Sequence, residues 1–176
     1  MICLLKVRPP LADHLAMLGH LPHIVAILER TEKVKDMGNP DSVSIANSAL
    51  QLINVLSENE ECIKRFQSTN VMSILLSSLQ PLHTFAAYSL ETIKKLIANN
   101  PRGPLLAQAL TNNIISFFVQ LIDDPMSDVK DFSGAKVNVI EALKLLAEDK
   151  TYGEQASNLL NAFPVWSQYR SQKHGI

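Results

Sequence analysis

Two histidines three positions apart are the first side chains of this sequence whose spacing could do chemistry. His20 and His23 are close enough in the chain to supply two ligands to one metal ion. No carboxylate or third histidine lies at helical spacing from them, so we expect exposed or capping histidines. We therefore predict no metal site and no cofactor.

An acidic cluster is the second candidate. Glu58, Glu60 and Glu61 lie in a segment that we predict to be a turn between two helices. Carboxylates at that position favour the N-terminus of the following helix through its dipole. A general acid and base would need a carboxyl group in an apolar pocket, which the polar residues around this cluster do not indicate. We interpret the cluster as structural.

The cysteines and the absence of catalytic sequence motifs also give no sign of an active site. Cys3 and Cys62 are far apart, show no CxxC spacing and fit a reducing compartment. The sequence contains no GxSxG, no phosphate-binding glycine loop and no HExxH. We predict that the chain is not an enzyme.

Composition limits the remaining classes. The chain has 176 residues, is 47% hydrophobic and carries a formal net charge of -1. Without a clustered basic surface we expect no binding to nucleic acid. The apolar runs are too short for a transmembrane segment or a secretory signal. Because the chain begins in mid-pattern, we expect a fragment of a longer protein.

Helices must position whatever surface the chain uses, and residues 42–79 show the repeating unit. The apolar stripe of its first helix consists of Ile45, Ala49, Leu52, Ile53 and Leu56, and its polar face of Asn47, Ser48, Gln51 and Asn54. A second apolar run follows Asn70. Neither helix can bury its apolar face alone, so the unit is expected to stack on others, as in an α-solenoid.

The unit recurs along the chain. Residues 70–76 overlay on 113–119, polar on polar and apolar on apolar. We predict one domain over 1–176 with repeats at about 1–30, 42–79, 84–122 and 131–173. Phe117 and Leu143 are expected in its core, and Trp166 either in the core or against a following segment of the parent protein.

Residues that typically end or begin helices occur near the start of the chain at positions that agree with this repeat. Gly19 suits the end of one helix and Pro22 the first turn of the next. The segment resembles the entry to the third helix of an armadillo repeat through Gly19, Leu21, Pro22, Ile24, Val25 and Leu28. The predicted fold class is all-α, a right-handed α-solenoid of armadillo/HEAT-like helical repeats.

The last quarter carries a more particular resemblance. The matching segments are Asp149 to Gln155, Asn158 to Leu160, Val165 to Ser167 and Gln172 to His174. They are similar to the C-terminal, armadillo-like region of the endosomal DnaJ subfamily C proteins of receptor-mediated endocytosis. The upstream repeats resemble the same region.

This resemblance implies a peripheral protein at the cytosolic face of early endosomes or in the cytoplasm. Its implied work is cargo sorting and recycling, with a sorting nexin, the WASH complex and the Hsp70 chaperone as partners. A J domain stimulates Hsp70 through a His-Pro-Asp triplet, which this sequence does not contain. The resemblance therefore implies a protein-protein interaction scaffold, with Hsp70 bound through a J domain elsewhere in the parent.

A groove along the long inner helices is the predicted contact surface. Its candidate residues, chosen by position, are Asn47, Gln51, Asn54, Glu91, Lys95, Asn138 and Glu141. The alternative is a generic armadillo adaptor that binds extended peptides as nuclear import receptors do. Those receptors repeat Trp and Asn along the groove, whereas the single tryptophan here lies in the last short helix. We also expect Leu4, Leu5 and Leu15 to expose an apolar N-terminal face that favours self-association.

Overall fold

The structure is a computed structural model of the 176-residue chain, and it describes residues 10–33, 40–79, 86–99, 103–123 and 132–170. Helices are the secondary structure throughout these ranges, with no strand among them. The prediction of an all-α fold is confirmed. The expectations for Leu4, Leu5 and Cys3 lie outside the described residues.

The helices follow one another in four groups. The first group is α2 (Pro10–Met17) and α3 (Leu21–Lys33), and the second is α4 (Pro40–Leu56), α5 (Glu60–Phe66) and α6 (Val71–Ser77). The third is α7 (Ala86–Ala98), α8 (Gly103–Thr111) and α9 (Ile114–Asp123). The fourth is α10 (Phe132–Ala147), α11 (Gly153–Asn161), the short 3-10 helix η1 (Pro164–Trp166) and α12 (Ser167–Arg170).

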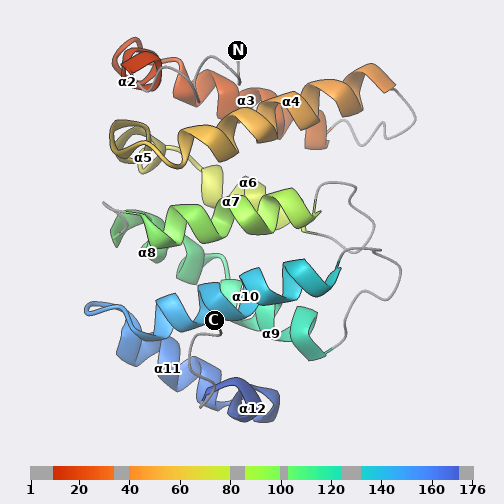
Figure 1. Cartoon of the computed structure of the whole chain (residues 1–176), viewed down its shortest axis with the longest axis vertical. Helices are drawn as coiled ribbons and strands as arrows, with labels where there is room; N and C mark the ends of the chain where they lie inside the picture. The colour runs from red at the N-terminus through yellow and green to blue at the C-terminus, as the bar shows by residue number, and fades with distance from the viewer. Residues whose placement is uncertain (1–9, 34–39, 80–85, 100–102, 124–131, 171–176) are drawn as a thin grey trace.

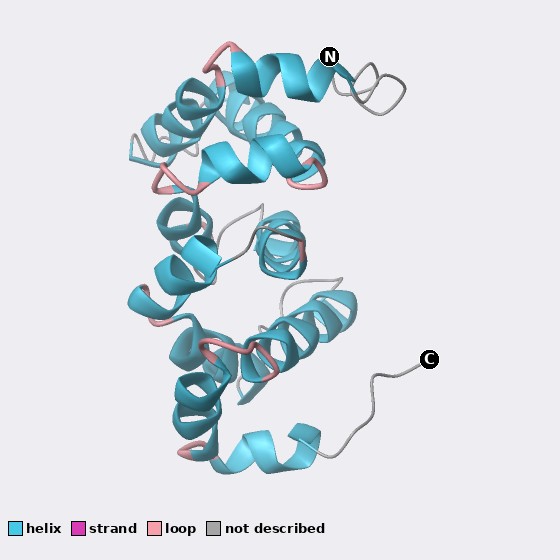
Figure 2. Ribbon diagram, turned by 90° about the vertical axis from the view of Figure 1, so that its left-hand side faces the viewer, coloured by secondary structure: helices cyan, strands magenta, loops and turns pink. Residues whose placement is uncertain are grey.

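These groups stack along the long axis of the molecule. The long helices α4, α7 and α10 lie in one row, α4 against α7 and α7 against α10 (Figure 1). A second row lies behind them, with α3 packed on α4, α6 on α7 and α9 on α10 (Figure 2). Each long helix thus contacts helices of its own group and of the neighbouring groups. The hand of the stack and its assignment to armadillo or HEAT repeats stay predictions.

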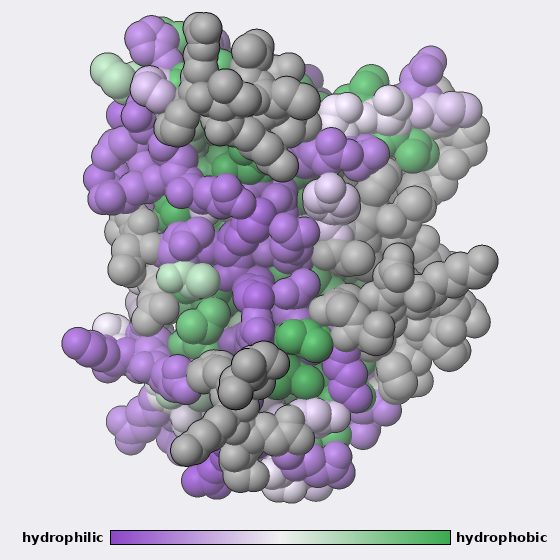
Figure 3. Space-filling view, viewed as in Figure 1, coloured by the Kyte–Doolittle hydropathy of each residue, from purple (hydrophilic) through white to green (hydrophobic). Residues whose placement is uncertain are grey.

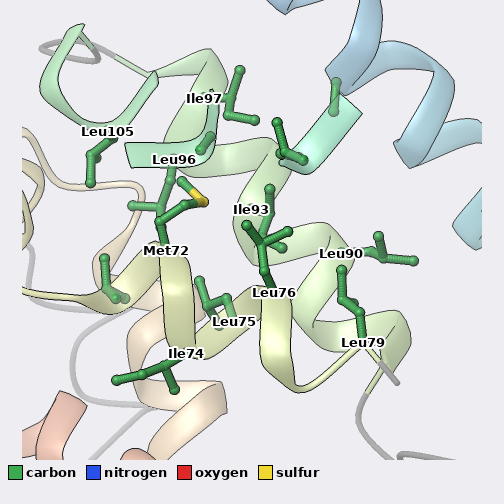
Figure 4. Packing of buried hydrophobic residues seen from close by; sticks show 14 of the residues in the cluster. Met72, Ile74, Leu75, Leu76, Leu79, Leu90, Ile93, Leu96, Ile97 and Leu105 are labelled. Atoms are coloured by element: carbon green, nitrogen blue, oxygen red, sulfur yellow. The ribbon is translucent and has the colours of Figure 1, made fainter. Parts of the chain in front are cut away.

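One apolar core runs through the stack, because each helix covers its apolar stripe with the next. Met72, Leu75 and Leu76 of α6 point toward Ile93 and Leu96 of α7 (Figure 4). Burying an aliphatic or aromatic side chain of this size contributes about 1.5–3 kcal/mol. The core therefore continues from one group into the next.

The expected core residues are largely where the sequence places them. Leu143 is fully buried, while Phe117 is half-buried and packs on the edge of the core beside the fully buried Phe118. Trp166 is buried as well, which favours the first of its two interpretations. The C-terminal helices close back on α10, where the Lys136 Nζ lies 5.5 Å from the centroid of the Tyr169 ring.

Several helix ends have the predicted residues. Gly19 follows α2 with φ +73°, a conformation that costs glycine little. Pro22 lies in the first turn of α3. The structure adds a cap that was not predicted: Asn59 accepts a hydrogen bond of 2.9 Å from the backbone N–H of Cys62 at the start of α5, and its amide donates to Asp13 Oδ1 at 2.8 Å.

A few expectations about faces and ends are wrong. Ile45 and Leu18 are exposed, although periodicity placed both on apolar stripes. In α2 the buried side chains are Ala12 and Ala16, because α5 packs closely on that side. The sequence makes Asp41 or Ser42 a plausible N-cap, but α4 begins at Pro40, whose fixed φ suits a first turn, so both residues lie inside the helix.

Candidate functional site: a polar ladder across the long helices

The seven residues predicted for the groove lie on the three long helices, Asn47, Gln51 and Asn54 on α4, Glu91 and Lys95 on α7, and Asn138 and Glu141 on α10. Most of them belong to a set of polar contacts that crosses from helix to helix. We call this set the polar ladder, and it consists of Asn54, Glu58, Glu91, Thr92, Lys94, Lys95, Asn138 and Glu141. Hydrophilic side chains gather over the middle of this face (Figure 3).

Asn54 is the buried centre of the polar ladder, with 5% of its surface exposed. Its amide nitrogen donates to Thr92 Oγ1 at 3.0 Å, and its amide oxygen accepts from Lys95 Nζ at 2.8 Å. The Thr92 hydroxyl donates in turn to the backbone oxygen of Tyr88 at 2.8 Å. In the folded chain α7 covers Asn54, so little of this side chain is accessible for the partner contact predicted from the sequence.

Lys95 joins this centre to the surface. Its Nζ lies 2.7 Å from Glu58 Oε1 and 3.0 Å from Glu91 Oε1, in addition to its bond to Asn54. Burial lowers the pKa of Lys95, but the hydrogen bonds to Glu58 and Glu91 outweigh it, so the pKa is raised above its ordinary value. An ammonium group has three N–H donors, and these three acceptors account for all of them.

Lys94 forms the next rung, between α7 and α10. Its Nζ donates to Asn138 Oδ1 at 3.2 Å and forms an ion pair with Glu141. Sequence reasoning selected both partners but missed Lys94 itself. A signal was present, because neighbouring helix residues point about 100° apart and an adjacent lysine pair can serve the helices on either side.

Asn47 and Gln51, the other two predicted groove residues, lie nearer the start of α4 than Asn54 does. The Gln51 amide donates to Asn47 Oδ1 at 3.0 Å, a contact within α4, and both residues are half-buried. Two further contacts missed from sequence also join successive groups. Asn99 donates to the backbone oxygen of Ser57 at 3.0 Å, and Gln108 donates to that of Gln67 at 2.9 Å.

The carboxylates of the polar ladder stand further into solvent than its lysines. The exposed fractions of the side chains are 59% for Glu58, 44% for Glu91 and 35% for Glu141, against 31% for Lys94 and 23% for Lys95. Three carboxylates facing two ammonium groups leave this part of the surface with one net negative charge. The groups that this surface presents to solvent are therefore carboxylates, which accept hydrogen bonds and bind cations.

The other chemical candidates lie apart from this face. Glu60 and Glu61 pair with Lys64 at 3.0 Å and 2.6 Å on the exposed side of α5. Among the described residues, no three His, Cys, Asp or Glu side chains converge as a metal site would require, and His20 and His23 belong to no such group. Burial, followed by the charges of Asp13 and Glu61, raises the pKa of Cys62 to about 12, so we expect its thiol to react slowly in the folded chain.

No single helix in the described ranges has the length and apolar composition needed to cross a membrane. Two sharply bent pairs, Pro10–Met17 with Leu21–Thr31 and Gly103–Thr111 with Ile114–Asp123, reach that length and composition only when their members are taken together.

The fold and the polar ladder together define the class of protein. It is an all-α stack of helical groups whose long helices are connected by buried and half-buried polar contacts. Comparison with known proteins narrows the class. DnaJ homolog subfamily C GRV2 of Arabidopsis thaliana is 24% identical over 219 aligned residues, which cover 100% of this chain and 8% of that protein. The match supports a distant relation to the DnaJ subfamily C proteins. No family model and no solved structure matches the chain.

Proposed function

We propose that this chain is a non-enzymatic protein-protein interaction scaffold in endosomal membrane trafficking, acting as part of a J-domain co-chaperone. Similarity to a DnaJ subfamily C protein over the whole chain is the observation that carries the proposal. The chain spans about 8% of that relative's length. The proposal assigns the co-chaperone activity to other parts of such a protein, because this sequence contains no His-Pro-Asp triplet.

The architecture suits a scaffold. Stacked helical groups present wide surfaces, and affinity on such surfaces comes from a few anchors within a broad contact. Contacts such as those of Lys94 and Lys95 connect successive groups, so the spacing between α4, α7 and α10 is held without a partner. A surface that is ordered before binding loses less conformational entropy when a partner docks.

Its work in this proposal is receptor-mediated endocytosis and recycling from endosomes to the plasma membrane or Golgi. The partners are a sorting nexin and the WASH complex, with Hsp70 recruited by the J domain of the parent protein. The site of action is the cytosolic face of early endosomes, reached through peripheral association of the parent.

Proximity labelling in cells tests this proposal. The 176-residue chain is fused to a biotin ligase, and the labelled proteins are compared with those of an unfolded variant of the chain carrying Leu50→Asp and Ile93→Asp in the core. We expect sorting nexin and WASH subunits to be enriched by the folded chain. Enrichment of no endosomal protein over the unfolded control would contradict the proposal.

A further inference from the structure

Building on the proposed scaffold role, we propose that the polar ladder docks an extended basic segment of a partner protein. In this arrangement lysine or arginine side chains contact Glu58, Glu91 and Glu141, and an aliphatic side chain contacts Tyr88 and Val137. The occupant is therefore a stretch of chain that combines basic and aliphatic residues.

Charge favours a basic occupant over an acidic one. The three carboxylates are the outermost charges of the polar ladder, and the ammonium groups of Lys94 and Lys95 lie behind them. The three donors of Lys95 already bind Asn54, Glu58 and Glu91, so none is left for an incoming carboxylate. A carboxylate has several acceptor positions and can bind a second cation while keeping its lysine.

The positions of two exposed apolar side chains beside the glutamates favour a partner segment that carries an aliphatic residue next to its basic ones. Tyr88, Glu91 and Lys95 follow one another at three and four residues on α7, so they lie on one face of that helix. Val137 and Glu141 have the corresponding spacing of four on α10. The side chains of Tyr88 and Val137 are 44% and 53% exposed, so α7 and α10 each carry an exposed apolar side chain one turn before a carboxylate.

The same pattern on two adjacent helices accounts for the extended form of the occupant. The long helices lie side by side with interaxial distances of about 8–10 Å. An extended chain advances about 3.3 Å per residue, so side chains two or three positions apart can reach equivalent sites on α7 and α10. Apolar side chains also lie beside the polar band over α10 (Figure 3).

Fluorescence anisotropy with matched peptides tests the inference. One labelled ten-residue peptide alternates lysine and leucine, a second replaces every lysine by glutamate, and a third replaces every lysine by serine. We expect the lysine peptide to bind with an affinity that falls as salt is raised, and the other two to bind at least tenfold more weakly. Equal or tighter binding of the glutamate peptide would overturn the inference.

Variants locate the binding on the face. Glu91→Gln and Glu141→Gln should each weaken the lysine peptide by about tenfold, the loss expected for one charged hydrogen bond. Tyr88→Ala leaves every side-chain contact of the polar ladder in place and should also weaken binding. Glu154 is exposed on α11, so Glu154→Gln removes the same charge elsewhere and should not change peptide binding. An equal loss in Glu154→Gln, or no loss in the face variants at unchanged thermal midpoint, refutes the docking site.

The outcomes also separate this inference from the proposed function. If Glu91→Gln with Glu141→Gln leaves endosomal labelling intact and the peptides show no preference, the basic occupant is wrong and the scaffold role stands. If the lysine peptide binds but the chain labels no endosomal protein, the docking face stands and the endosomal role is wrong.

Discussion

Asn54→Ala should destabilise this protein far more than a change to any exposed asparagine. The substitution removes one neutral hydrogen bond to Thr92 and one charged hydrogen bond from Lys95. Such bonds contribute about 0.5–1.5 and 1.5–3 kcal/mol respectively. Thr92 keeps its bond to Tyr88, and Lys95 keeps both carboxylates, so neither is left without a partner. We expect the free energy of unfolding to fall by about 2–3 kcal/mol, toward the lower end of that sum.

Chemical and thermal unfolding followed by far-UV circular dichroism measure this loss. For a chain of this size the thermal midpoint moves about 2–4 °C per kcal/mol, so we expect a decrease of about 5–10 °C. The matched control is Asn47→Ala on the same helix, where the amide oxygen accepts a hydrogen bond from Gln51 one turn away. Alanine has the higher helix propensity, so the control should change stability by less than about 0.5 kcal/mol.

Equal effects of the two substitutions would refute the reasoning. In that case the buried contacts of Asn54 would contribute no more than a contact within one helix. A change in the denaturant slope together with the midpoint would instead indicate that the groups of the stack unfold separately. The double variant Asn54→Ala with Thr92→Val should be less destabilised than the sum of its parts, because the two residues share a bond.

Three further predictions follow from single residues. Because the pKa of Lys95 is raised in the folded state, its ion pairs stabilise the protein below the ordinary lysine value of 10.5 and lose that contribution as pH rises through the higher folded value. The stability difference between the native chain and Lys95→Met should therefore narrow above about pH 10.5 in pH-dependent thermal unfolding, and a constant difference would contradict the assignment. In a Cys3→Ser background, buried Cys62, with its pKa of about 12, should react with a thiol reagent at pH 8 only in denaturant, and rapid reaction of the folded protein would contradict its burial. Gly153→Ala should cost about 1–3 kcal/mol, because a Cβ there would lie 2.6 Å from a carbonyl oxygen at the end of α10. Gly103→Ala meets no atom within 4 Å and should be neutral or slightly stabilising in the same thermal assay.

Local pattern was sufficient for much of the fold. The period of apolar residues predicts helices in all the described ranges, and Gly19, Pro22 and Asn70 mark ends or starts that the structure retains. These signals depend on residues a few positions apart, which interact in the same way wherever the helix lies. Ile45 and Leu18 depart from the pattern because a stripe is buried only where another helix covers it.

Sequence position placed the seven candidate residues on the three long helices, but it did not reveal their contacts. Their role as a partner-binding groove stays a prediction. Sequence alone could not distinguish Asn54 from Asn47, because both are asparagines on the predicted polar face of α4. One is buried between helices and the other bonds within its own helix.

What the sequence by itself determined is the all-helical character of the described residues and the placement of the candidate polar residues on the long helices. Tertiary structure alone decided how those residues are used. It turned Lys94 toward α10 and Lys95 toward α4, and it enclosed Asn54 while leaving three carboxylates in solvent. The physical reason is that periodicity is a local property, whereas the partner of a polar group depends on the register between helices about forty residues apart in the chain.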